Sequence, residues 1–344
     1  MELQIRNVSK TYAQGIEALK NVSLTIPAGM YGLLGPNGAG KSTLMRILAT
    51  LQNADAGSIR LGDLDVLVDK DAVRQTLGYL PQAFGLYPGS CAEDLLDHFA
   101  LLKGVGERKA RREVVQALLQ QTNLWHVRRQ KLGTYSGGMR QRFGIAVALV
   151  GNPTLLIVDE PTAGLDPAER VRFLNLLSEV GESSVVILST HIVDDVSELC
   201  IRMAIIDRGR ILLEAEPLRA VAELQGRIWR RVVDAKAMES VAREHQVLST
   251  KLHAGRRVVR VYSDTPPGSG FDVAEPDLED VYFRTMSASS GRREVGGRHC
   301  EARRDLPVRE QVSASPRLAR VDLHGAPGRD GIVRQGELCR RPAL

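Results

Sequence analysis

Residues 35–43 have the residue types and the spacing that bind phosphate groups. They fit the pattern G-x-x-x-x-G-K-[ST] and lie between two apolar runs, 30–34 and 44–48, which predict a strand before them and a helix after them. Glycines let the backbone turn its N–H groups inward, and the helix adds the positive end of its dipole. This phosphate loop is therefore predicted to bind a polyphosphate through Gly35, Pro36, Asn37, Gly38, Ala39, Gly40, Lys41, Ser42 and Thr43.

Lys41 and Ser42 give the phosphate loop its specific chemistry. Lys41 is expected to reach the β- and γ-phosphates as a positive charge, and the Ser42 hydroxyl to ligate a Mg²⁺ that bridges the same two phosphates. The alternative is a glycine-rich turn that only joins a strand to a helix. Every fixed position of the pattern and the strand–helix context favour the phosphate site.

Two adjacent carboxylates, Asp159 and Glu160, follow the apolar run 155–158. In a parallel α/β sheet, ligands bind at the carboxyl ends of the strands. Asp159 is predicted to hold the Mg²⁺ shell, and Glu160 to orient the attacking water or to accept its proton. An acidic turn after a strand is the alternative, and the pattern alone does not decide between them. A phosphate loop in the same chain favours catalysis.

A second anion-binding helix start is predicted at Ser136, Gly137 and Gly138. Serine is a good N-cap, and the two glycines leave the backbone N–H groups of the first turn uncovered. One nucleotide in one compact domain does not need two such helix starts. The second one is therefore expected to serve a nucleotide that is held by another copy of the chain.

The net charge of +5 is concentrated at the end of the 344-residue chain, because residues 287–344 contain twelve arginines and seven acidic residues. The remainder is neutral, so no nucleic-acid partner is expected. No apolar run approaches the roughly 18 residues that span a bilayer, and the N-terminus lacks the order of a signal peptide. We expect a cytoplasmic protein that touches a membrane only through a partner.

The hydrophobic pattern divides the chain into parts. Alternating apolar residues predict strands at 2–8 and 18–26, separated by a loop at 10–15 that carries Tyr12, and a further strand at 77–81 ends at Gln82. Helical spacing from Cys91 to about Val150 predicts an inserted helical subdomain, and the apolar runs 155–158 and 185–188 predict buried parallel strands. Mixed short elements follow to Met286. The arginine-rich tail 287–344 is predicted to be disordered, or to be an out-of-frame extension.

Taken together, these segments resemble the ATP-binding subunit of ABC transporters. The resemblance covers about residues 2–220 and keeps the family's motif order, and it is specific because the signature motif occurs with the others. Tyr135 stands where the signature usually has leucine. The matching segments are the Walker A loop 35–43, the Q-loop glutamine Gln82, the signature 136–142, the Walker B strand 155–160, the D-loop 163–167, the switch histidine His191 and the aromatic Tyr12.

The resemblance implies an α/β fold: a P-loop NTPase core with an antiparallel β subdomain, an inserted helical subdomain at about 88–150, and a small C-terminal α/β accessory region. The ATP-binding domain would span 1–222, the accessory region 223–286 and the tail 287–344.

The resemblance also implies roles for single residues. Two domains would close head to tail around ATP, with Ser136, Gly137 and Gly138 of one facing the Walker A loop of the other. Glu160 would be the catalytic carboxylate, and His191 would contact the γ-phosphate and help to hold the water. The remaining roles implied are adenine stacking for Tyr12, completion of the Mg²⁺ site for Gln82, and coupling of the two sites for Asp166.

The function implied is ATP hydrolysis that powers transport through a separate integral membrane permease. The second ATP-binding subunit would be the same chain or a different one, and the protein would be peripheral on the inner face of the cell membrane. The region after about Gln225 looks like the C-terminal extension of bacterial drug-export ATPases, which favours export. A soluble ABC-type ATPase acting on a ribosome or DNA is the alternative; a phosphate-loop GTPase or kinase would leave residues 136–142 unexplained.

Overall fold

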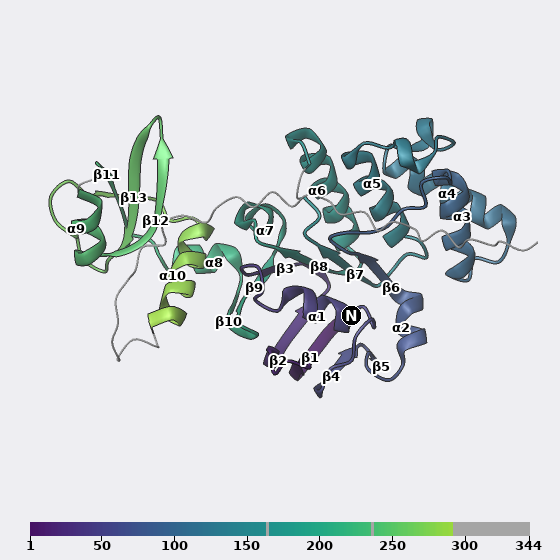
Figure 1. Cartoon of the computed structure of the whole chain (residues 1–344), viewed down its shortest axis with the longest axis horizontal. Helices are drawn as coiled ribbons and strands as arrows, with labels where there is room; N and C mark the ends of the chain where they lie inside the picture. Colours follow the sequence, from purple (N-terminus) through teal and green to yellow (C-terminus); the bar gives the residue numbers. More distant parts are fainter. Residues whose placement is uncertain (163–164, 235–236, 292–344) are drawn as a thin grey trace, which may run out of the picture. The chain divides into compact units, whose positions relative to one another are not determined.

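A six-stranded sheet forms the centre of the computed structural model, which describes residues 1–162, 165–234 and 237–291. Its strand order is β10-β9-β3-β8-β7-β6, and β10 alone runs antiparallel to its neighbour (Figure 1). The sheet is therefore mainly parallel, as the sequence predicts. Its strands are β3 (Gly29–Leu34), β6 (Leu77–Leu80), β7 (Leu155–Asp159), β8 (Val185–Thr190), β9 (Arg202–Asp207) and β10 (Arg210–Ala215).

The central strands are apolar along their whole length because both faces of the sheet are covered. In β7, Leu155 and Ile157 pack into one hydrophobic core, whereas Leu156 and Val158 pack into the other. Strand β8 divides its residues in the same way. The sequence analysis did not assign β9 and β10.

One face of the sheet packs against an antiparallel sheet of order β2-β1-β4-β5 and against helices α1 and α2. The predicted loop 10–15 is wrong at its start, because Lys10 and Thr11 still pair with Leu19 and Glu17 and extend β1 to Thr11. The elements are β1 (Glu2–Thr11), β2 (Glu17–Pro27), β4 (Ala56–Leu61), β5 (Leu64–Asp65), α1 (Lys41–Leu48) and α2 (Lys70–Thr76).

The other core contains the helices between β6 and β9, including the helical segment predicted at about 88–150. Apolar residues at spacings of three and four face this core, among them Leu96 and Ala100 in one helix and Val115, Leu118 and Leu119 in the next. The helices are α3 (Ala92–Leu102), α4 (Arg108–Gln121), η1 (Trp125–Val127), η2 (Leu132–Thr134), α5 (Gly137–Ala148), α6 (Pro167–Gly181) and α7 (Val193–Leu199).

After β10, the described residues add a third sheet, of order β12-β13-β11-β14, and helices α8, α9 and α10. Helix α10 continues to Gly291, past the predicted start of the tail at Ser287, because the run Ser287–Ser290 contains neither glycine nor proline to stop a helix. The rest of the predicted tail, 292–344, lies outside the described residues. The elements are α8 (Pro217–Ala222), β11 (Ile228–Val233), α9 (Ala237–Glu244), β12 (Gln246–His253), β13 (Arg256–Tyr262), β14 (Asp272–Val273) and α10 (Leu278–Gly291).

Candidate active site

The phosphate loop joins the end of β3 to the start of α1, as the sequence predicts. Gly38 and Gly40 have φ angles of 81° and 111°, which side-chain-bearing residues rarely adopt. At Gly40 a Cβ atom would lie 2.5 Å from the carbonyl oxygen of Ala18, and at Gly35 it would lie 2.3 Å from that of Ile206. The loop therefore needs glycine both for its backbone turn and for its close packing against neighbouring strands.

Lys41 is buried at the first position of α1, with its side chain only 5% exposed. Its Nζ donates to the carbonyl oxygens of Gly35 (2.6 Å) and Pro36 (3.2 Å), so the loop's own backbone holds the ammonium group. Burial lowers the pKa of Lys41, and the negative charges of Glu160 and Asp159 oppose this shift. An anion bound in the loop would also raise the pKa of Lys41 and so favour the charged form of the lysine.

Glu160 lies directly after β7 and has a φ angle of 49°, although it is not a glycine. Such strained backbone costs of order 1–3 kcal/mol and gathers at functional sites. Gln82 Nε2 donates to Glu160 Oε2 at 2.8 Å, while His191 Nδ1 lies 3.2 Å and Lys41 Nζ 3.9 Å from Glu160 Oε1. Three predicted residues from three distant segments thus surround one carboxylate.

Asp159 fits the predicted role of a Mg²⁺ ligand. The residue is 3% exposed, and its buried Oδ1 has no hydrogen-bond partner. A buried carboxylate oxygen without a partner is costly unless a cation satisfies it. Within the described ranges no group of three His, Cys, Asp or Glu side chains could hold a metal ion. A Mg²⁺ here would therefore also need hydroxyl, amide and phosphate oxygens, as the predicted set of Ser42, Gln82 and a nucleotide provides.

Tyr12 lies beside the phosphate loop and is partly exposed. Its hydroxyl is 3.1 Å from Thr43 Oγ1 and 3.3 Å from Gln52 Oε1. The hydroxyl end is thus fixed next to the start of α1, and part of the ring is open to contact. The sequence analysis did not single out Gln52, which shares this hydroxyl.

The signature residues lie at the start of α5, where Ser136 is the N-cap and its Oγ accepts from Met139 N at 3.2 Å. Ser136 and Gly137 are exposed, and nothing lies within 4 Å of where a Gly137 Cβ would stand. Tyr135 replaces the usual leucine without loss of packing, because it is buried and its hydroxyl donates to Val127 O. In the part of the chain that the structure describes, no hydrogen bond or ion pair joins residues 136–138 to the phosphate loop.

Asp166 is the exposed N-cap of α6, and its Oδ1 accepts from Glu169 N at 2.9 Å. Of the predicted D-loop, Ala163 and Gly164 lie outside the described residues. The sequence analysis missed Asp195, a fully buried carboxylate in α7 that bonds to Thr162 and Arg170. No spacing pattern distinguishes it from the neighbouring Asp194.

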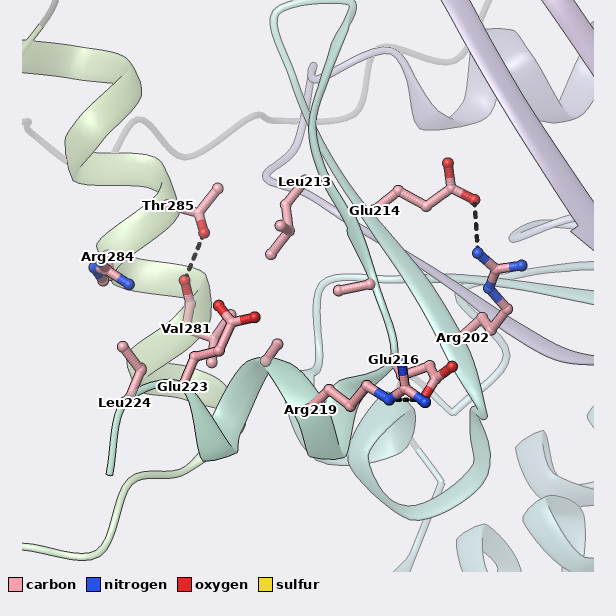
Figure 2. Close-up of a pocket in the computed structure, with 12 residues that line it drawn as sticks. Arg202, Leu213, Glu214, Glu216, Arg219, Glu223, Leu224, Val281, Arg284 and Thr285 are labelled. Atoms are coloured by element: carbon pink, nitrogen blue, oxygen red, sulfur yellow. Dashed lines mark hydrogen bonds and ion pairs between the residues drawn. The ribbon is translucent and has the colours of Figure 1, made fainter. Parts of the chain in front are cut away.

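A second charged cavity, the α10 cavity, lies between β10, α8 and α10 and has a volume of about 370 Å³. Figure 2 shows Arg202 directed to Glu214 and Arg219 directed to Glu216. The Arg219–Glu216 pair is 2.7 Å long, but the Arg219 side chain is 80% exposed. These charges have local partners and are partly exposed, so they do not require a ligand. The cavity is lined by Arg202, Leu213, Glu214, Ala215, Glu216, Arg219, Ala220, Glu223, Leu224, Val281, Arg284 and Thr285.

Comparisons with known proteins show the family to which the chain belongs. Residues 19–163 match the family model described as ABC transporter. The chain is 32% identical over 302 residues to an uncharacterized ABC transporter ATP-binding protein, YxlF, of Bacillus subtilis, covering 83% of this chain and 100% of that one. It is 35% identical to the daunorubicin/doxorubicin resistance ATP-binding protein DrrA of Streptomyces peucetius, covering 77% and 78% of the two chains.

A solved structure has the same fold over most of the described chain. It is the dimeric post-hydrolysis state of the ATP-binding cassette MJ0796 bound to ADP and phosphate. The TM-score is 0.58 at 28% identity, and the match covers 62% of this chain and 98% of that one. The phosphate loop and the Glu160 cluster thus belong to a fold that is seen elsewhere with a hydrolysed nucleotide.

Proposed function

Since this chain belongs to the family of ABC transporter ATP-binding proteins, and is therefore an ATPase subunit of that type, we propose that it works as one of a closed pair that drives export through a separate permease. The observation that supports a pair of subunits is that the predicted site residues lie in two separate places within one chain. Lys41, Gln82 and His191 gather around Glu160, whereas Ser136 and Gly137 face outward on another helix. A second subunit, identical or different, is needed to bring such a helix start to the nucleotide.

We assign ATP to the phosphate loop and the adenine ring to the open part of Tyr12. Lys41 binds the β- and γ-phosphates, and backbone N–H groups of the loop cradle them. Ser42, Asp159 and Gln82 would hold Mg²⁺, which would supply positive charge next to the phosphates. Gln82 would have to release Glu160 to do so, because its amide now donates to that carboxylate.

Glu160 is the group that accepts a proton from the attacking water. Its Oε atoms already accept from Gln82 and lie within reach of His191 and Lys41, so the carboxylate is held at the carboxyl end of β7. His191, which is nearly half exposed, contacts the γ-phosphate and orients the water. Ser136, Gly137 and Gly138 of the partner subunit supply the second anion-binding helix start, and Asp166 lies at the dimer interface.

The segment from Gln82 to Ser90 connects this site to the helical subdomain. Gly133 N donates to Pro88 O, and Leu132 N donates to Ser90 O, so the far end of the segment is bonded to that subdomain. Tyr87 between these points is two-thirds exposed. A large exposed side chain on a segment that contacts Glu160 is a suitable contact for a permease.

The finer parts of the proposal concern the membrane. Within the described ranges no helix has the length and apolarity to cross a bilayer. The relatives include proteins named for daunorubicin, doxorubicin and linearmycin resistance, and this supports export and a position at the inner face of the cell membrane through a permease. The ribosome- or DNA-directed alternative has no support among these names.

The test of the paired arrangement is Glu160→Gln, which keeps the size of the side chain but removes the base. We expect ATP binding to persist, phosphate release to stop, and an ATP-dependent dimer to accumulate in light scattering coupled to size-exclusion chromatography. Adding Ser136→Arg should prevent that dimer, because the arginine blocks the partner's phosphate contact. Normal turnover by Glu160→Gln, or a dimer indifferent to Ser136→Arg, would contradict the proposal.

The permease contact is tested with Tyr87→Ser. The isolated subunit should hydrolyse ATP as the wild type does, but co-purification with its permease, and export from vesicles, should fall. Loss of ATPase activity in the isolated variant would contradict this role and would show that Tyr87 stabilises the structure of the segment.

A further inference from the structure

Asp195 is completely buried in α7, four residues after His191. It accepts hydrogen bonds from Thr162 Oγ1 at 2.6 Å, from Arg170 Nε at 2.7 Å and from Thr190 Oγ1 at 3.5 Å. Removing a carboxylate from water is costly unless such partners surround it, so their arrangement is well specified. An apolar residue at this position would leave Thr162 and Arg170 without their acceptor.

The partners of Asp195 come from the segments that carry the catalytic residues. Thr162 follows Glu160 by two residues, and Thr190 directly precedes His191. The hydroxyl of Thr190 also accepts from Ile192 N at 3.0 Å. His191 therefore lies between Thr190 and a residue whose backbone is bonded to the Thr190 side chain. The position of Asp195 therefore affects the position of His191.

Helix α6 links this cluster to the signature helix through two adjacent residues. Arg170 binds Asp195 on α7, whereas Glu169 binds Arg142 on α5, with 2.9 Å between Glu169 Oε2 and Arg142 Nε. The side chains of Glu169 and Arg142 are both largely buried. Helix α6 stands between α5 and α7 in Figure 1, in agreement with these contacts. Two ion pairs thus connect the helix that begins at Ser136 to the loop that carries His191.

We propose that Asp195 is a positioning residue that sets His191 according to the position of α6, and that Glu169 and Arg170 relay to it the position of the signature helix. The inference rests on the proposed function, in which Ser136 engages a nucleotide held mainly by the partner subunit. Closure on that nucleotide displaces α5, the Arg142–Glu169 pair moves α6, and the Arg170–Asp195 pair then moves the His191 loop. Ion pairs and packed helices are physical carriers of such coupling.

The first experiment compares Asp195→Asn with Asp194→Asn in the full chain. Asparagine keeps an acceptor for Thr162 but removes the charge that holds Arg170. We expect kcat to fall roughly tenfold, as for the loss of a moderate coupling, with the ATP dissociation constant changed less than about twofold. Asp194 is the matched control, because it is exposed, adjacent and of the same type. Its variant should keep wild-type kcat.

The second experiment is a double-mutant cycle between Glu169→Gln and Asp195→Asn. In a relay, breaking either ion pair disconnects the same path, so the double variant should be no slower than the slower single variant. Two independent structural defects would instead multiply. If Asp195→Asn does not fold, Arg170→Gln replaces it in the cycle, since it breaks the same ion pair from the Arg170 side and leaves the Thr162 bond to Asp195 intact.

Several outcomes overturn the inference: unchanged kcat in Asp195→Asn, an equal loss in Asp194→Asn, multiplying effects in the cycle, or a lowered melting temperature with normal kcat. These are distinct from failure of the proposed function. That failure would appear as a wild-type chain without ATPase activity and a Glu160→Gln variant that forms no ATP-dependent dimer.

Discussion

The nucleotide site and the α10 cavity are both lined by basic and acidic side chains, but the charges are arranged differently. At the nucleotide site, Lys41, Glu160 and Asp159 are nearly buried, their partners come from distant segments, and Asp159 Oδ1 has no partner at all. At the α10 cavity, Arg219 and Glu216 are exposed neighbours in sequence that bond to each other. A cavity lined by charges is therefore weak evidence for a ligand; charges buried without a complete set of partners are stronger evidence.

One ion pair near the α10 cavity differs from the others. Arg260 forms a two-point contact with Asp280, which is 1% exposed, and Asp280 also accepts from Asp277 N at the start of α10. Asp280 N donates to Asp277 Oδ1 in return, so the two residues form a reciprocal cap. This pair holds α10 to the third sheet. The buried Arg260–Asp280 pair therefore stabilises the fold, whereas the buried charges at the nucleotide site are available to bind a ligand.

The largest expected effect is that of Lys41→Ala on catalysis. Loss of a positive charge aimed at the transferred phosphate should lower kcat on the order of 10³-fold. Phosphate release at saturating ATP measures it, and Arg219→Ala in the α10 cavity is the comparison. Similar losses in the two variants would remove the distinction between the two regions.

Asp280→Ala should affect stability and not chemistry. It leaves Arg260 without its main partner and removes the half of the reciprocal cap in which Asp280 accepts from Asp277 N, so the free energy of unfolding should fall by about 3 kcal/mol. Denaturant titration measures this loss, while kcat per folded molecule should stay at the wild-type value. A fall in kcat in the folded fraction would mean that α10 contributes to the nucleotide site.

The pH dependence of ATP binding should report the buried state of Lys41. Burial places its pKa below the ordinary value of 10.5, and only the charged form attracts phosphate. As the pH rises through this lowered pKa, the protonated fraction of Lys41 falls, so the affinity for ATP should decrease already below pH 10.5, where an ordinary lysine would still be charged. Isothermal titration calorimetry measures the dissociation constant. In Lys41→Ala the constant should be higher and nearly independent of pH; an equal slope in both proteins would assign the titration to another group.

Arg219→Ala should have the smallest effect. An exposed ion pair between the N-cap residue of a helix and a residue in its first turn contributes below about 0.5 kcal/mol. Its midpoint of chemical denaturation and its ATPase rate should match those of the wild type. A marked change in either would show that the α10 cavity has a ligand or a partner.

Much of the site follows from local sequence. The phosphate loop, the carboxylates at 159–160 and the helix start at 136–138 are each contained in one strand–turn–helix or loop–helix unit, and local backbone preferences place their side chains. The same reasoning predicted the apolar central strands and the inserted helices. It failed where composition was the only guide, as at the end of α10, and where strand pairing decided the boundary, as at Lys10 and Thr11.

The sequence by itself determined which residue types could bind and hydrolyse a nucleotide. Only the tertiary structure decided that Gln82, His191 and Lys41 meet at Glu160, because the strand order of the sheet brings together segments that lie far apart in the chain. The tertiary structure also decided that Asp194 is exposed whereas Asp195 is buried. Both are acidic residues in the same helix turn, but successive residues on a helix point about 100° apart, so one faces water and the other faces α6.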